Sequence, residues 1–384
     1  MALIGLSLMV IFWILGAVRA EADLLPAVRE TVPEADHVER ESNGIYAAWA
    51  DAEEQQLIGY VAIGTANGYG GPIELAVAVN QQGQITGISL IGHKETPSWF
   101  TRVMDGDVID SLTGKYYSDL FNLGEDVDSI TGATYTTNAL AKATLDGSHI
   151  AAEMLGLEVI KPPPPEIQFG IPEIAVLALF AVGYFGHQRG FKYKKQARWV
   201  SMLAGLIILG FMYNLPFTMA YFVKLSLGYW PQWQANLYWY FLLGGILFVV
   251  TADNKNPYCE WFCPFGAAQE CMGLIGGAKP YPMSKHRDWL KWLQRIVALT
   301  AVLLGIFFRN PGLASFEIFG ALFSFVGTPI MFMVLALTLV AALFVKRPWC
   351  NYLCPIRPVV EFIGIMRKWI LELWQKVNPL SKTV

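Results

Sequence analysis

A short cysteine-containing stretch occurs twice in the chain, and it constrains the fold more than any other feature of the sequence. Residues 255–264 read KNPYCEWFCP and residues 346–355 read KRPWCNYLCP, so both copies contain the pattern C-x3-C-P at a constant offset of 91 positions. Each copy follows an apolar run long enough to cross a bilayer, which predicts a repeated unit of membrane helix and cysteine hairpin. Two such units related by a pseudo-twofold axis would bring four thiols together.

The four repeated cysteines are candidate metal ligands: Cys259, Cys263, Cys350 and Cys354. Thiolates bind iron–sulfur clusters, a single iron or structural zinc, and the spacing alone leaves all three open. Neither copy contains the C-x2-C-x2-C run of bacterial ferredoxins, so one shared site is favoured over two complete clusters. The alternative is four unrelated buried cysteines. The fifth cysteine, Cys271, aligns with Phe362 in the second copy, and we expect it to pack as a small apolar side chain.

The composition is that of a membrane protein. Hydrophobic residues make up 54% of the chain and charged residues only 15%, whereas soluble domains contain about 25% charged residues. The net charge of -3 and the lack of a Lys/Arg stripe argue against nucleic acid as a partner.

Apolar runs predict an all-α polytopic membrane domain with six transmembrane helices and an internal repeat. The runs are residues 2–18, 169–185, 199–221, 235–250, 290–308 and 327–344. Residues 1–20 are interpreted as an uncleaved anchor because no basic leader precedes the first run. Residues 166–356 would form a five-helix membrane domain. Residues 357–384 would form an amphipathic C-terminal helix that lies in the membrane interface or packs against the protein.

Basic residues in the short connections predict the orientation in the membrane. They gather after the second helix and around the cysteine hairpins: Arg189, Lys192, Lys194, Lys195, Arg198, Lys255, Lys279, Lys285, Arg287, Lys346 and Arg347. The connections on the other face offer only Lys224 and Arg309. The positive-inside rule therefore places both termini and both hairpins in the cytoplasm, in a multi-pass protein of the cytoplasmic (inner) membrane.

Residues 21–165 are more polar and are predicted to form an extracytoplasmic α+β domain. Alternating runs at Leu57–Ile63, Ile73–Val79 and Ile85–Ile91 predict strands, and residues 138–155 predict a helix. The proline-rich residues 161–165 would form a stiff linker to the membrane domain.

A second candidate site is the loop before this helix, where residues 128–134 read DSITGAT. Small residues let the backbone approach a ligand closely, and exposed amides at a helix start favour a phosphate. A Ser/Thr-rich helix cap explains most loops of this kind. The stretch also resembles the D-x-x-[ST]-G-A-T flavinylation motif of flavin domains in Rnf and Na⁺-translocating NADH:quinone reductase complexes. That resemblance implies FMN joined through its phosphate to the hydroxyl of Thr134.

The resemblance extends to two upstream segments, GYGGPI at residues 68–73 and HKETP at residues 93–97, the second of which lies by the flavin in that family. Residues 98–100 read SWF where the family usually has Gly-Leu-Gly, and a tryptophan there could stack on the flavin or cover the strands. His93 is given no catalytic role. Beside Thr134, the FMN contacts implied by the resemblance are Asp128, Ser129, Ile130, Thr131, Gly132, Ala133, Thr136, Glu95, Thr96 and Trp99.

As a whole, the chain resembles the NosR-type membrane flavoproteins, including relatives associated with reductive dehalogenases. NosR itself resembles a protein with an added cytoplasmic ferredoxin domain, whereas this sequence has one expected amphipathic helix at that place, so the comparison implies a separate electron-transfer partner. A flavin transferase would attach the FMN.

These features predict a transmembrane electron carrier, an oxidoreductase component rather than a stand-alone enzyme. Electrons would pass between the cysteine site and FMN, in either direction, with separate donor and acceptor proteins or a quinone. The hydrocarbon core of about 30 Å is a long gap, which a quinone, a partner or an iron site could bridge. The positions of the histidines argue against a haem relay within the chain, since they lie in the outer domain or by cytoplasmic loops. The alternatives are a subunit of an ion-pumping complex, or a redox sensor or maturation factor for a partner enzyme.

Overall fold

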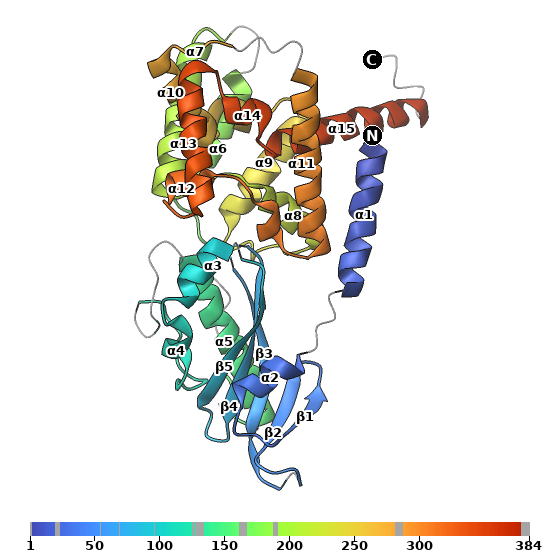
Figure 1. Cartoon of the computed structure of the whole chain (residues 1–384), viewed down its shortest axis with the longest axis vertical. Coiled ribbons are helices and arrows are strands. Elements are labelled where there is room, and N and C mark those ends of the chain that lie inside the picture. Colours follow the sequence, from blue (N-terminus) through green and yellow to red (C-terminus); the bar gives the residue numbers. More distant parts are fainter. Residues whose placement is uncertain are drawn as a thin grey trace.

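The computed structural model describes residues 2–19, 24–53, 55–68, 70–95, 97–124, 127, 134–160, 167–186, 191–280 and 287–377. These residues form a sheet-containing part and a helical part, stacked end to end (Figure 1). The predicted proline-rich linker at residues 161–165 lies outside the described residues.

A five-stranded antiparallel sheet organises the first part, with its strands in chain order. The strands are β1 (His37–Ser42), β2 (Ile45–Trp49), β3 (Leu57–Asn67), β4 (Pro72–Asn80) and β5 (Ile85–His93). The last three were predicted. The first two were not, because β1 reads HVERES and four of its six residues are exposed, so it lacks an apolar alternation.

Helices cover both faces of the sheet, with α5 (Thr134–Met154) on one face and α2 (Leu25–Thr31) on the other (Figure 1). The short helices α3 (Pro97–Met104) and α4 (Val108–Leu112) lie near α5. Helix α5 approaches β3 closely: a side chain at Gly64 would place its Cβ 1.9 Å from the carbonyl oxygen of Ala143. This packing confirms the predicted α+β class.

The helical part has many elements around one core: α6 (Ile171–Gly186), α7 (Lys194–Ala204), η1 (Gly205–Met212), α8 (Met219–Leu227), α9 (Leu237–Asp253), η2 (Tyr258–Phe262), α10 (Pro264–Gly276), α11 (Arg287–Phe307), η3 (Pro311–Ala314), α12 (Phe319–Phe323), α13 (Pro329–Phe344), α14 (Pro348–Tyr352) and α15 (Ile356–Val377). The N-terminal helix α1 (Ala2–Arg19) lies against α11, where the guanidinium of Arg19 covers the rings of Phe307 and Phe308.

One of the six predicted spans is wrong as a single helix. Residues 199–221 instead divide into α7, the π-helix η1 that continues it, an extended stretch and the start of α8. The helix ends because Asn214 adopts a left-handed backbone with φ of 47°. Pro216 then lacks an amide donor and disfavours helix at the residue before it.

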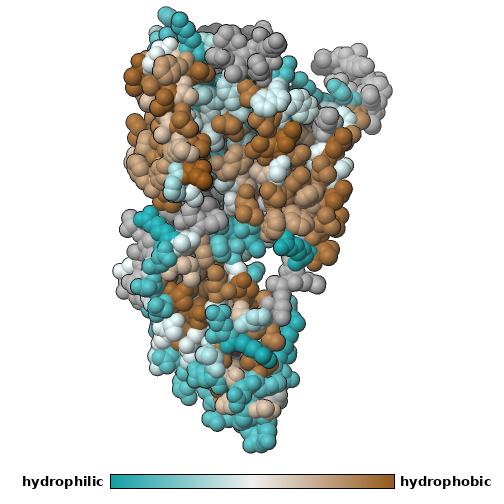
Figure 2. All heavy atoms as spheres, in the orientation of Figure 1, coloured by the Kyte–Doolittle hydropathy of each residue, from teal (hydrophilic) through white to brown (hydrophobic). Residues whose placement is uncertain are grey.

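Within the described residues, one helix, Asp288–Phe307, is long and apolar enough to cross a membrane by itself. Four apolar helices are shorter: Leu3–Arg19, Ile171–Gly186, Leu237–Asp253 and Pro329–Phe344. Hydrophobic side chains dominate the visible surface of the helical part, while hydrophilic ones cover much of the sheet-containing part (Figure 2).

The internal repeat is visible in the order of elements. A long apolar helix, a short helical turn with the first cysteine of the hairpin and a further helix follow one another in α9, η2 and α10, and again in α13, α14 and α15. Helix α15 runs across the bundle and extends past it toward the N-terminal end of α1 (Figure 1). Its side chains Ile365, Ile370 and Trp374 are at least half exposed, as an amphipathic helix in an interface would leave them.

Candidate cofactor sites

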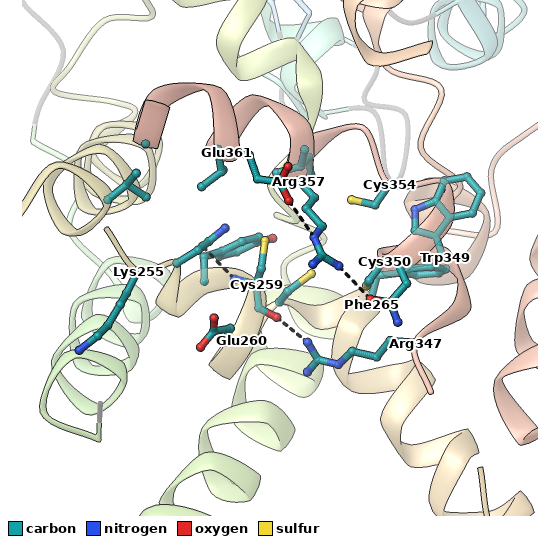
Figure 3. Close-up of a pocket in the computed structure, with 18 of the residues that line it drawn as sticks. Lys255, Cys259, Glu260, Phe265, Arg347, Trp349, Cys350, Cys354, Arg357 and Glu361 are labelled. Carbon is teal, nitrogen blue, oxygen red and sulfur yellow. Dashed lines mark hydrogen bonds and ion pairs between the residues drawn. The ribbon is translucent and has the colours of Figure 1, made fainter. Parts of the chain in front are cut away.

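The structure places all four predicted cysteine ligands on one pocket of about 570 Å³. Cys259 lies in η2 and Cys263 directly after it, while Cys350 lies in α14 and Cys354 soon after that helix. Figure 3 shows sulfur atoms from both hairpins turned toward the same space. Cys271, in α10, does not line this pocket.

The two hairpins have the same backbone geometry. The Cys263 amide donates to the carbonyl oxygen of Tyr258 at 2.7 Å, and the Cys354 amide donates to that of Trp349 at 2.8 Å. The second sulfur of each hairpin also accepts backbone N–H groups that follow the proline, from Phe265 in the first copy and from Ile356 in the second. The sequence repeat is therefore also a structural repeat in this backbone hydrogen bond and in the amide donors to the second sulfur.

Without a bound metal, the protein environment disfavours the deprotonated form of the four thiols. Burial raises the pKa of all four thiols, that of Cys263 to about 11, and neighbouring cysteines add to this effect for Cys259, Cys263 and Cys354. Arg347 opposes this shift for Cys259, Cys263 and Cys350. A positively charged metal centre would supply the remaining compensation, because metal-bound thiols are deprotonated.

Four thiols on one pocket are a ligand set that suits an iron–sulfur cluster. Among the described residues, no group of three or more His, Cys, Asp or Glu side chains is arranged to hold one metal ion. A single tetrahedral zinc with bonds of about 2.3 Å requires four sulfurs in tight mutual contact. An iron–sulfur cluster distributes its thiolates over several irons and so accepts ligands around a wider pocket.

Charged side chains hold the hairpins together. Glu270 on α10 pairs with Arg198 of α7 at 3.0 Å and with Arg347 of the second hairpin at 2.6 Å. The same Arg347 donates from Nη1 to the carbonyl oxygen of Cys259 at 2.7 Å (Figure 3). The second hairpin is thereby tied to the first and to the helix behind it.

The predicted FMN site is described only in part. Residues 128–133, which include Asp128, Ser129, Ile130, Thr131, Gly132 and Ala133, lie outside the described residues, as does Thr96. Thr134 is the first residue of α5 and Trp99 lies in α3, but the described part of the structure excludes both side chains. The start of a 21-residue helix at Thr134 fits a phosphate, since its first amides have no partner within the helix.

Glu95 organises the described part of this site. Its carboxylate is 1% exposed and accepts hydrogen bonds from the Gly70 amide at 2.8 Å and the Thr136 hydroxyl at 3.0 Å. Burial raises the pKa of this carboxyl against the effect of those donors. Two of the three glycines of the GYGG segment are required here: a Cβ at Gly68 would lie 2.1 Å from Glu95 Oε1, and one at Gly70 would lie 2.2 Å from the Lys94 carbonyl oxygen.

An aromatic face accompanies this segment. The imidazole of His93 stacks on the ring of Phe100 with centroids 3.6 Å apart, and its Nδ1 has no hydrogen-bond partner within the described ranges. A half-buried stacked ring with an unsatisfied nitrogen suits a neighbouring polar, planar ligand. The described residues are thus compatible with a flavin.

The loop at residues 94–95, called the flavin-side loop, packs against the helical part. Lys224 of α8, 6% exposed, lies close enough to Glu95 for their charges to interact. The chain at Gly312 in η3 also contacts the Glu95 backbone, since a Cβ there would be 3.0 Å from its carbonyl oxygen. The sequence had placed Lys224 in a loop, where nothing distinguished it from a solvent-exposed lysine.

Two protein families match parts of the chain. The FMN-binding domain family matches residues 68–147. The 4Fe-4S binding domain family matches residues 235–282 and 326–372, one stretch for each cysteine hairpin. The chain has FMN and iron–sulfur cofactors. These matches decide among the metals that the cysteine spacing had left open.

Several known proteins are similar to parts of the chain. A subunit of the proton-translocating ferredoxin:NAD(+) oxidoreductase complex of Clostridium ljungdahlii is 28% identical, over 36% of this chain and 78% of that protein. A subunit of the ion-translocating oxidoreductase complex of Shewanella oneidensis is 35% identical, over 20% of this chain and 41% of that protein. Putative electron transport protein YccM of Escherichia coli is 23% identical, over 31% of this chain and 37% of that protein. The chain spans less than half the length of the last two. Together, the two family matches and these similarities support an electron-transfer flavoprotein.

Proposed function

We propose that the chain conducts electrons across a membrane, between an iron–sulfur cluster on Cys259, Cys263, Cys350 and Cys354 and an FMN esterified to Thr134. The observation that carries the proposal is the position of the cysteine pocket, because the hairpin elements lie toward the end of the helical part that is remote from the FMN-binding domain (Figure 1). A cluster carries single electrons and FMN can store two, so the pair suits a relay between one-electron and two-electron partners.

The surface supports immersion of the helical part in a membrane. Large apolar side chains on its apolar helices are well exposed, among them Ile174, Phe248, Leu304, Leu337 and Phe344. Such a surface would be a liability in water and is ordinary in lipid. Basic residues around the hairpins favour the cytoplasm for the cluster, and the FMN domain would then be extracytoplasmic.

A continuous packed route supports electron movement through the helical part. Tyr258, next to Cys259, is fully buried, and its hydroxyl accepts a hydrogen bond from the Phe217 amide at 2.7 Å. The ring of Phe217 contacts Tyr221 and Phe222 of α8, with centroids 5.0 and 5.1 Å apart. The same helix carries Lys224 beside the flavin-side loop, so bonded and closely packed atoms connect the two ends.

Partners follow from this arrangement. Both proposed centres lie inside one chain, so a separate donor and a separate acceptor, either of which can be a protein or a quinone, would complete the circuit. A flavin transferase would form the phosphoester at Thr134.

A second candidate function is membership of a redox-driven ion-translocating complex, as the names of two relatives describe those proteins. Glu317 favours it. This carboxylate is buried in the helical part, with Oε1 accepting the Met219 amide at 2.7 Å and Oε2 without a partner in the part of the chain that the structure describes. The helix centres assigned from the sequence contained no acidic residue, but Glu317 lies between helices. Buried ionisable groups of this kind are typical of ion pathways.

The test is the cofactor content and redox behaviour of the purified protein. We expect iron without zinc, covalent flavin, and a paramagnetic signal after reduction. Reduced flavin that is re-oxidised together with the cluster by an added acceptor supports the electron carrier. A flavin that stays in one state while the cluster cycles supports a sensor instead, and protein without iron refutes both.

A further inference from the structure

The two cysteine hairpins match in backbone but differ in the groups that reach their first sulfur. In the first copy, Asn256 stands three residues before Cys259, its Oδ1 accepts the Cys259 amide at 3.1 Å, and its side chain also hydrogen-bonds to the Cys259 thiol. In the second copy the equivalent position is Arg347, which instead donates to the Cys259 carbonyl oxygen. The donor that reaches the sulfur of Cys350 comes from another element.

Gln269 of α10 provides that donor. Its side chain is fully buried, and its Nε2 lies 3.2 Å from the Cys350 sulfur and 3.1 Å from the Phe265 carbonyl oxygen. Its Oε1 accepts the Trp349 amide at 2.9 Å. These three bonds fix the orientation of the amide, so its N–H is held toward the sulfur. The residue at the equivalent position of the second copy is Val360, which cannot donate, so the interaction is not repeated.

We propose that Gln269 is a positioning residue that raises the reduction potential of the cluster through its N–H···S hydrogen bond to Cys350. Adding an electron to a cluster increases the negative charge on its thiolates. A fixed donor at one thiolate stabilises the reduced form more than the oxidised form, and hydrogen bonds to the sulfurs are among the levers that set such potentials. The inference rests on the iron–sulfur site of the proposed function.

Gln294 offers a matched control. It is also a buried glutamine, 5% exposed, on α11, and it also binds the second hairpin. Its Nε2 donates to the carbonyl oxygens of Cys354 at 2.7 Å and Cys350 at 3.5 Å, and not to a sulfur. Gln294→Leu therefore removes an equivalent packing and hydrogen-bonding role while leaving the Cys350 donor in place.

The experiment is a redox titration of the cluster in the purified full chain, followed by paramagnetic resonance. For Gln269→Leu and Gln269→Met, we expect the ratio of reduced to oxidised cluster at a fixed potential to fall about tenfold, a shift of about 59 mV for one electron. Gln294→Leu is expected to keep the wild-type midpoint. Equal midpoints in iron-loaded Gln269 variants and wild type would overturn the inference.

A purely structural role has a different signature. If both Gln269 variants lose iron while Gln294→Leu retains it, Gln269 holds the hairpins together and the tuning proposal fails. If wild-type protein contains no iron, the proposed function itself fails, so the two failures are distinguishable.

Discussion

The guanidinium of Arg347, at the start of the second cysteine hairpin, donates a hydrogen bond to the carbonyl oxygen of Cys259 in the first hairpin at 2.7 Å. The same side chain forms an ion pair with Glu270 at 2.6 Å, and both partners are less than a quarter exposed. One residue thus bridges both copies of the repeat and the helix that follows the first.

Arg347→Ala is expected to destabilise the protein by about 1–3 kcal/mol, because it removes the Arg347 donor from the Cys259 carbonyl and one of the two arginine partners from the partly buried Glu270 carboxylate. Iron content should fall with it. Thermal unfolding in detergent and iron analysis measure both effects. Arg295→Ala is the control, since Arg295 pairs with Glu361 at a site where both side chains are more than 40% exposed. Equal losses of stability and iron in the two variants would contradict a specific role for Arg347 in joining the hairpins.

A shared cluster predicts equal effects from both hairpins. Cys259→Ser and Cys350→Ser should each abolish the paramagnetic iron signal, because either one removes a ligand from the same centre. Cys271→Ser, outside the pocket, should retain it. Half of the signal surviving in either hairpin variant would indicate two separate centres.

The proposed covalent attachment of FMN depends on the hydroxyl of Thr134. Thr134→Val should yield folded protein without flavin fluorescence on a denaturing gel. Thr144→Val is the matched control, because Thr144 lies in the same helix and its buried hydroxyl has no hydrogen-bond partner among the described residues. Fluorescence that persists in Thr134→Val would place the ester elsewhere.

The Glu270 network predicts a pH dependence of stability. Burial alone would raise the pKa of the Glu270 carboxyl, but hydrogen bonds and charge from Arg198 and Arg347 hold it below its ordinary value of 4.5. A depressed folded-state pKa means that the ionised carboxylate stabilises the fold above the unfolded-state pKa. That contribution is lost as the pH falls through the folded-state pKa.

Glu270→Gln should therefore lower the unfolding temperature at pH 7, and the difference from wild type should shrink as the pH is lowered below 4.5. Unfolding scans in detergent across this range measure it. Glu372→Gln, at an exposed site on α15, should show no such trend. A difference that stays constant with pH would exclude the carboxylate charge as its origin.

The sequence predicted the parts of this molecule that repeat or alternate. The constant offset between the hairpins predicted that the four cysteines would converge, and the structure places them on one pocket. The strands β3, β4 and β5 followed from alternating apolar residues, whereas β1 was missed because its exposed polar side chains carry no such pattern. Hydropathy alone also joined residues 199–221 into one helix and gave too little weight to Asn214 and Pro216 inside an apolar run.

Residues that have no equivalent in the other copy of the repeat could not be identified from the sequence repeat. Gln269 has no equivalent in the second copy, and Glu317 and Lys224 become notable only because the fold buries them. Their environment is created by segments far away in the chain, such as Cys350 for Gln269 and Met219 for Glu317. Tertiary contacts of this kind leave no local signal.

The most direct test of the central claim is single-turnover flavin reduction in sealed proteoliposomes, with a membrane-impermeant reductant confined to the side of the cysteine hairpins. The electron-carrier proposal predicts that flavin bleaches in wild type and stays oxidised in Cys350→Ser, although that variant retains its covalent flavin. Equal flavin reduction in both proteins, or reduction only from the opposite side, would contradict a path from the cluster to FMN.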